Sequence, residues 1–303
     1  MKAIYTLLFL AIISLVLIGC SGGQTPAITK GAFLGGAQGI VVTFEPLSVK
    51  EENVYTVFDS EDFSLDVDVR NGGEETVPAG DITLRLLGPP REAFQNIPQW
   101  ELKNMQQIEK VSEFNPQGGE EVVSFTPNAR AKYITPVTGF ADITWNLEFE
   151  YKYKTYVIAS EVCFKGDLTD PKVCTVQEPK QFAVSGAPIT VTAVEEDSAG
   201  KGIMLLKFTV KNAGLGKATV SGEEFDSRFD QVAYTIDEPQ KWECKSGGRE
   251  NEARLVEGQA DVVCRLKTAL AEEDVFVKQV KLTLSYVYKE LVQEKLRVKE
   301  SVK

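Results

Sequence analysis

Histidine is absent from all 303 residues of the sequence. Its absence excludes Ser-His-Asp and Cys-His catalytic arrangements, zinc sites with imidazole ligands, and imidazole acid–base catalysis. Sugar hydrolysis by paired carboxylates and calcium binding by oxygen ligands need no histidine, so they stay open. The sequence contains no motif that is typical of a catalytic or cofactor-binding site. We therefore expect a protein that is not an enzyme and has no cofactor.

Positive charge is scarcer than negative charge. The chain holds 33 lysines and arginines against 44 aspartates and glutamates, a formal net charge of −11. An acidic surface repels the phosphates of nucleic acids and anionic lipid head groups. The composition therefore predicts no nucleic-acid partner.

Long apolar runs are confined to the N-terminus. Tyr5 to Ile18 is almost entirely apolar and follows the basic Lys2, the layout of a secretion signal. The run is short for a membrane span, which needs about 20 residues. Leu17-Ile18-Gly19-Cys20 resembles a lipoprotein box, in which cleavage leaves Cys20 at the N-terminus with lipid on its sulfur. We predict a lipoprotein-type signal peptide over residues 1–20 and a lipid anchor at Cys20. An ordinary signal peptide and an uncleaved membrane helix are the alternatives.

Cysteine is rare, with five residues in the chain. If Cys20 carries lipid, four remain, and an even number in an exported protein is typical of disulfides. Three pairings are possible, and closeness in sequence favours Cys163 with Cys174 and Cys244 with Cys264. A four-cysteine zinc site is the alternative, but the closely spaced cysteine pairs of such sites are missing. We predict two disulfides that close local hairpins or loops, and no metal site.

An alternating pattern begins after a segment rich in serine, glycine, threonine and proline at residues 21–39, which predicts a flexible tether. Apolar and polar residues then alternate with a period of two, which is typical of half-buried strands. This pattern predicts strands at residues 40–44, 63–69, 82–86 and 123–125. The less regular part that follows residue 91 is expected to contain a short helix around Trp100 to Glu109.

The clearest strand lies at residues 141–153, where polar residues alternate with an apolar set. That set is Ala141, Ile143, Trp145, Leu147, Phe149, Tyr151 and Tyr153. A slip of one residue would expose all of them, so we expect a tightly fixed register. Their shared parity predicts a core face, with an aromatic platform for a glycan or peptide as the alternative. Thr155 to Phe164 is expected to return beside this strand.

The second half of the chain repeats landmarks of the first. Residues 63–73 read FSLDVDVRNGG and residues 205–214 read LLKFTVKNAG. LEFEYKYKTYVIASEV, at residues 147–162, is echoed by LTLSYVYKELVQEKLRV at residues 282–298. Two landmarks in the same order and at similar spacing predict duplicated domains. We place them at residues 40–180 and 181–303, each an ordinary size for one β-sandwich core.

The strand ends at Val69 to Gly72 and Val210 to Gly214 are similar to those of CARDB-like and related immunoglobulin-like modules of prokaryotic surface proteins. Three further stretches resemble a group of archaeal exported β-sandwich proteins: Phe33 to Ile40, Tyr151 to Thr155 with Cys163 following, and Ser185 to Thr192. The resemblance implies an all-β fold with two tandem immunoglobulin-like sandwiches on the cell surface. It brings no catalytic residues. Unlike antibody domains, the chain has no tryptophan between two paired cysteines.

Two acidic clusters are candidates for calcium, although neither has the spacing of a calcium loop. Asp167 and Asp170 form the first; Glu223, Glu224, Asp226 and Asp230 form the second. Solvated acidic loops are the simpler interpretation. Trp100 and Trp242 lie outside the regular alternation and are candidates for a recognition surface.

The sequence thus predicts a lipid-anchored protein on the extracellular face of the membrane, with a non-catalytic role in binding or adhesion. The expected partners are the membrane, through the N-terminal lipid, and a protein or glycan ligand at the cell surface. The alternative is a self-assembling subunit of a surface layer or filament, for which the long strands near the C-terminus offer an edge.

Overall fold

The computed structural model describes residues 31–302 except 171–172 and 177–178. The predicted signal peptide, Cys20 and most of the predicted tether lie outside these residues. The described chain is all-β, as predicted, and its one helical element is the 3-10 turn η1 (Arg91–Ala93). Within the described ranges, no helix has the length and hydrophobicity that crossing a bilayer requires. The expected helix around Trp100 to Glu109 is wrong, because strand β8 (Glu101–Lys103) pairs with strand β6 (Ile82–Gly88) there.

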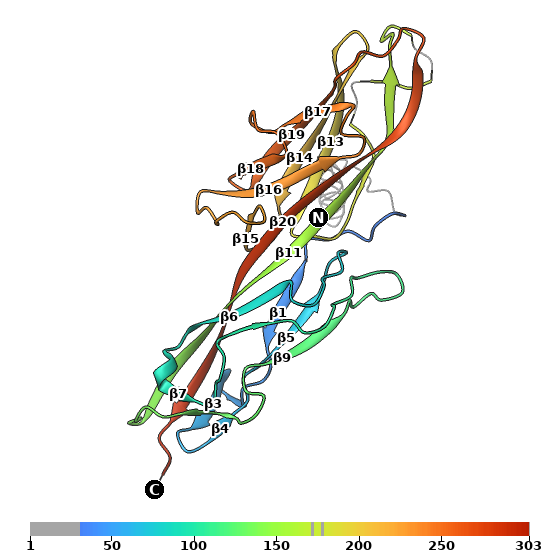
Figure 1. Cartoon of the computed structure of the whole chain (residues 1–303). Coiled ribbons are helices and arrows are strands. Elements are labelled where there is room, and N and C mark those ends of the chain that lie inside the picture. Colours follow the sequence, from blue (N-terminus) through green and yellow to red (C-terminus); the bar gives the residue numbers. More distant parts are fainter. Residues whose placement is uncertain (1–30, 171–172, 177–178, 303) are drawn as a thin grey trace, which may run out of the picture.

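Two lobes lie along a pair of very long strands (Figure 1). In the first lobe, the sheet β1-β5-β9 faces strands β2, β3, β6 and β8, and three short strands close one end. The bounds are β1 (Ile40–Phe44), β2 (Val49–Glu51), β3 (Val54–Phe58), β4 (Asp62–Phe63), β5 (Asp66–Asn71), β6 (Ile82–Gly88), β7 (Phe94–Gln95), β9 (Glu120–Ser124) and β10 (Ala131–Tyr133). The predicted strands at 40–44 and 82–86 lie within β1 and β6, the one at 63–69 is divided between β4 and β5, and the one at 123–125 overlaps the end of β9.

The second lobe repeats this pairing order. Strands β13-β14-β19 correspond to β1-β5-β9, and β18-β16 corresponds to β8-β6. The bounds are β12 (Phe182–Val184), β13 (Ile189–Gly200), β14 (Ile203–Asn212), β15 (Lys217–Thr219), β16 (Phe229–Ile236), β17 (Trp242–Lys245), β18 (Glu252–Val256) and β19 (Gln259–Leu266). Both lobes consist of large, mainly antiparallel sheets with buried inner faces, consistent with β-sandwich packing.

Strands β11 (Phe140–Lys165) and β20 (Val275–Lys299) form an antiparallel pair, here called the spine. Pairing runs from Phe140 opposite Lys299 to Lys165 opposite Val275, with one irregularity between Ala159 and Val162. At about 3.3 Å per residue the spine is about 80 Å long. The expected return of Thr155 to Phe164 beside residues 141–153 is therefore wrong: both segments belong to β11, and the neighbour of each is β20.

Each spine strand contributes to both lobes. β11 pairs with β6 near Phe149 in the first lobe, and with β12 near Ile158 in the second. β20 runs the opposite way, from β16 and β15 in the second lobe to the parallel strand β3 at Leu296–Lys299 in the first. A cut between residues 180 and 181 would therefore leave each piece without a strand that completes its lobe.

One asparagine in each lobe ties a tight turn to the spine. Asn71 Oδ1 accepts hydrogen bonds from the Tyr153 hydroxyl at 3.0 Å and the Gly73 N–H at 3.1 Å. Its Nδ2 donates to the carbonyl of Glu75 at 2.6 Å. A Cβ at Gly73 would collide with the Tyr153 hydroxyl, so only glycine fits there.

The same contacts recur in the second lobe. Asn212 Oδ1 accepts from the Tyr288 hydroxyl and the Gly214 N–H, both at 3.1 Å, and Nδ2 donates to the Gly216 carbonyl at 3.0 Å. The repeated landmarks in the sequence thus make the same hydrogen bonds at equivalent places in both lobes.

The middle of the spine is here called the waist, and four tyrosines fill it. Tyr151 lies opposite Tyr288 and Tyr153 opposite Tyr286, with ring centroids 5.8 and 6.4 Å apart. All four are buried, as is Trp145, so the predicted core face is confirmed. Burial raises the pKa of the Tyr151, Tyr153 and Tyr286 hydroxyls far above the usual range. These side chains are core.

Glu290 is a carboxylate on the mainly apolar inner face of β20, opposite Phe149. Within the described residues it forms no ion pair, and desolvation raises its pKa above the ordinary value. A raised carboxyl pKa means that the charged form destabilises the fold at neutral pH, and that this penalty disappears as pH falls through the folded-state pKa.

We expect Glu290→Gln to raise the free energy of unfolding at pH 7 by less than about 1 kcal/mol, because the half-buried group keeps solvent screening. The gain should shrink towards pH 4. Urea unfolding at both pH values measures it, with exposed Glu257→Gln as the control. A gain that grew on acidification would contradict this account.

Candidate functional site

A pocket of about 380 Å³ opens at the end of the second lobe, where β11 finishes and β20 begins. Strand β17 and the segments 238–241 and 266–274 complete its wall. At about 3.3 Å per residue, the eleven positions from Tyr153 to Phe164 place it about 35 Å from the waist. The ends of the two spine strands that line this pocket lie at the tip of an elongated molecule (Figure 1).

The floor of the pocket is aromatic. Phe164 and Phe276 lie opposite each other across the spine, with nearly parallel rings whose centroids are 4.9 Å apart. Trp242 packs edge-on against Phe164 at 6.0 Å. Phe164 and Trp242 are buried, whereas Phe276 is 43% exposed. Phe276 is therefore the ring that an incoming molecule can reach.

The rim of the pocket is charged. Glu238 pairs with Lys278, and with Lys241 at 3.1 Å, and these two hydrogen bonds lower the pKa of its carboxyl group. All three side chains are well exposed. Asp274 fixes the neighbouring turn, because its carboxylate accepts the Ala271 N–H at 2.9 Å. An apolar floor with a few polar groups at its edge is the usual composition of a ligand pocket.

Both disulfides lie beside this pocket. Cys163 immediately precedes Phe164 and is joined to Cys174, which closes a surface loop. Cys244 follows Trp242 by two positions and is joined to Cys264, its direct neighbour on β19. These are the pairings that closeness in sequence favours, and neither connects the two facing sheets. Each one restrains a wall of the pocket.

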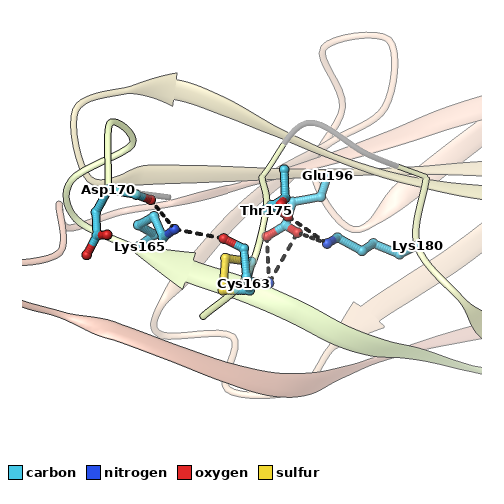
Figure 2. Close-up of a disulfide and its surroundings, with 7 residues drawn as sticks. Cys163, Lys165, Asp170, Thr175, Lys180 and Glu196 are labelled. Carbon is cyan, nitrogen blue, oxygen red and sulfur yellow. Dashed lines mark hydrogen bonds and ion pairs between the residues drawn. A yellow bond between two sulfur atoms is a disulfide. The ribbon is translucent and has the colours of Figure 1, made fainter. Parts of the chain in front are cut away.

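Three buried charged side chains support the Cys163–Cys174 loop (Figure 2). Lys165 donates from Nζ to the carbonyls of Asp170 at 2.6 Å and Cys174 at 2.7 Å. Glu196 accepts the Cys163 N–H and pairs with Lys180 at 2.7 Å. Lys165 thus holds Asp170 and Cys174 to the sheet through their carbonyls, and the charge of Glu196 is balanced by Lys180. The sequence signal for this network is a glutamate at a core-facing position of β13.

The other candidate residues are distributed over the molecule. Trp100 is 6% exposed and packs on Trp145, so its assignment to a recognition surface is wrong. Asp167 accepts two hydrogen bonds from Thr169, and buried Asp230 accepts the Ala218 N–H at 2.7 Å. In the part of the chain that is described, no three acidic or cysteine side chains gather as a metal site.

The pocket was not predicted as a unit. Trp242 was a candidate and lines it, but Trp242 is buried, and the exposed contact is Phe276. Searches with family models and against curated proteins find no match to the sequence.

Proposed function

We propose that the protein is a lipid-anchored, non-catalytic binding protein of the cell surface, built from two tandem immunoglobulin-like sandwiches. The two disulfides support an oxidising location outside the cytoplasm. The lipid on Cys20 would hold the chain at the membrane, and the segment 21–39 would connect it to the lobes. The pocket floored by Phe276 would make the contact with the ligand.

The observation that carries this proposal is the set of hydrogen bonds that attach the N-terminal segment to the lobes. The carboxylate of buried Glu74 accepts the N–H groups of Leu34 at 2.9 Å, Gly35 at 2.8 Å and Gly186 at 2.7 Å. Gly186 lies between β12 and β13 of the second lobe and Glu74 in the first, so these bonds fix the incoming chain beside the waist, the blue segment of Figure 1. An anchor joined at the waist leaves both tips free.

The chemistry of the pocket favours a glycan or a peptide. A sugar ring or an apolar side chain fits against the exposed face of Phe276, while Lys241, Lys278 and Glu238 can hydrogen-bond polar groups at the edge. At protein interfaces, the residues that contribute most of the binding energy are often aromatic, and other side chains surround them and exclude water. Phe276 and the charged rim have this arrangement.

We expect Phe276→Ala to weaken binding of the soluble chain to the cell envelope roughly 30-fold, because truncating an aromatic anchor costs about 2 kcal/mol. Binding is measured with fluorescently labelled protein starting at Ser21 on cells lacking the native copy. Phe114→Ala is the matched control, since Phe114 is 98% exposed in the first lobe and far from the pocket. Equal affinities of the two variants would remove the pocket from the proposal.

Self-assembly into a surface layer or filament is the second candidate function. The observation that favours it is that β20 ends inside the first lobe, where its last residues pair in parallel with β3. An assembly built on this strand would not use the tip pocket, so Phe276→Ala separates the two functions.

A further inference from the structure

The last part of β20, residues 291–299, fills a groove of the first lobe, here called the β20 groove. One side of the groove is β11, with Glu148 opposite Leu291 and Phe140 opposite Lys299. The other side is β3, which pairs in parallel with Leu296–Lys299. The groove is formed by residues 51–59 and 140–148, which lie far from the inserted strand in sequence. The first lobe is therefore completed by a strand from a distant part of the chain.

The inserted strand makes both apolar and charged contacts. Leu296 and Val298 are completely buried in the first lobe. Arg297 donates to Asp142 at 2.6 and 2.9 Å, and Lys299 pairs with Glu51. Past the strand, the Ser301 N–H donates to Asp59 at 3.0 Å. Basic residues of the chain end thus meet acidic residues of the groove.

Exchange of this strand would move only residues 291–302, the last part of the chain that the structure describes. We propose that the β20 groove also accepts residues 291–299 of a second copy, so that molecules associate by exchanging their C-terminal strands. The contacts within one molecule and between two would be the same, which is why strand exchange is a low-cost route to association.

Protein concentration decides between the two arrangements. A strand tethered to its own groove has an effective concentration of about 1 mM, so dilute molecules keep their own strand. Molecules crowded on a surface reach comparable local concentrations. The inference rests on the proposed surface anchoring only for this crowding, which the test supplies by other means.

The test uses two full-length soluble chains, one carrying Asn146→Cys and the other Gln293→Cys. These positions lie opposite each other on the outer face of the spine, with Gln293 Nε2 2.6 Å from Asn146 Oδ1. Ile158→Cys and Lys281→Cys form the control pair. They are also opposite each other, but in the second lobe, whose pairing remains within one chain after exchange.

Each pair of chains is mixed on vesicles that capture an N-terminal tag, at increasing surface density, and oxidised. We expect disulfide-linked heterodimers from the 146/293 mixture, rising with density and at least tenfold above the 158/281 mixture. A single chain with Asn146→Cys and Gln293→Cys must close its disulfide internally, which shows that the variants fold. Equal yields from the two mixtures, or no heterodimer although the double variant closes, would overturn the exchange. Neither result affects the Phe276 experiment.

Discussion

Deleting residues 291–303 is expected to unfold the first lobe and leave the second lobe folded. Leu296 and Val298 are fully buried, and burial of each side chain contributes roughly 1.5–3 kcal/mol. The deletion also removes the β20 partner from β11 over Phe140 to Glu148. Losses of this size approach the about 5–15 kcal/mol that stabilise a whole domain.

Hydrogen exchange measured by mass spectrometry resolves the two lobes. We expect amides of β1, β5 and β6 to lose protection in the deletion variant, while β13, β14 and β19 keep it. Deletion of residues 301–303 alone is the control for a shortened terminus.

Single substitutions in the inserted strand should have matching effects. Leu296→Ala should lower the free energy of unfolding by about 2–5 kcal/mol. Lys295→Ala, at an exposed position of the same strand, should change it by no more than about 0.5 kcal/mol. A first lobe that stayed protected without residues 291–303 would show that the inserted strand is dispensable.

Asn71→Ala is expected to lower the free energy of unfolding by about 3–5 kcal/mol. The side chain is completely buried and serves the Gly73 N–H, the Tyr153 hydroxyl and the Glu75 carbonyl. Alanine removes all three hydrogen bonds, leaving the Tyr153 hydroxyl only the Glu75 N–H, and each buried group that loses its partner costs about 1–3 kcal/mol. Asn212→Ala removes the same contacts in the second lobe, but Asn212 is only half-buried. Water can replace part of what is lost there, so we expect about 1–3 kcal/mol.

Urea unfolding of both variants measures the difference. A double-mutant cycle with Tyr153→Phe then gives the coupling between Asn71 and the spine, which we expect to exceed 0.5 kcal/mol because the residues share a hydrogen bond. If both alanine variants lay within about 0.5 kcal/mol of the parent, the asparagine contacts would not hold the turns to the spine.

The strands and their inner faces could be predicted from the sequence because a period of two specifies which side chains share a face. It does not specify the neighbour of a strand. Tyr153 and Tyr286 are partners although 133 positions separate them, and the sequence echo around them indicated duplication without showing that the copies pair. Thr155 is a polar residue at a core position, and it interrupts the apolar set although the strand continues through it. It is buried inside β11, where its hydroxyl donates to the Ile189 carbonyl and contacts the Tyr286 hydroxyl.

The candidate site was less predictable for a related reason. The pocket combines the end of one spine strand, the start of the other and the short strand β17, so no single stretch of sequence contains it. Phe276 looks like an ordinary strand residue until its opposite neighbour is known to be Phe164. The cysteines were easier, since both pairs close short loops within one part of the chain.

The central claim is that the mature chain is carried outside the cytoplasm and fastened to lipid through Cys20. Mass spectrometry of the protein isolated from its own membranes tests this most directly. The account predicts a mature N-terminus at Cys20 with a mass increase from lipid on that residue, recovered with the membranes after high-salt washing. Water-soluble protein that retained Met1 and carried no modification would contradict it.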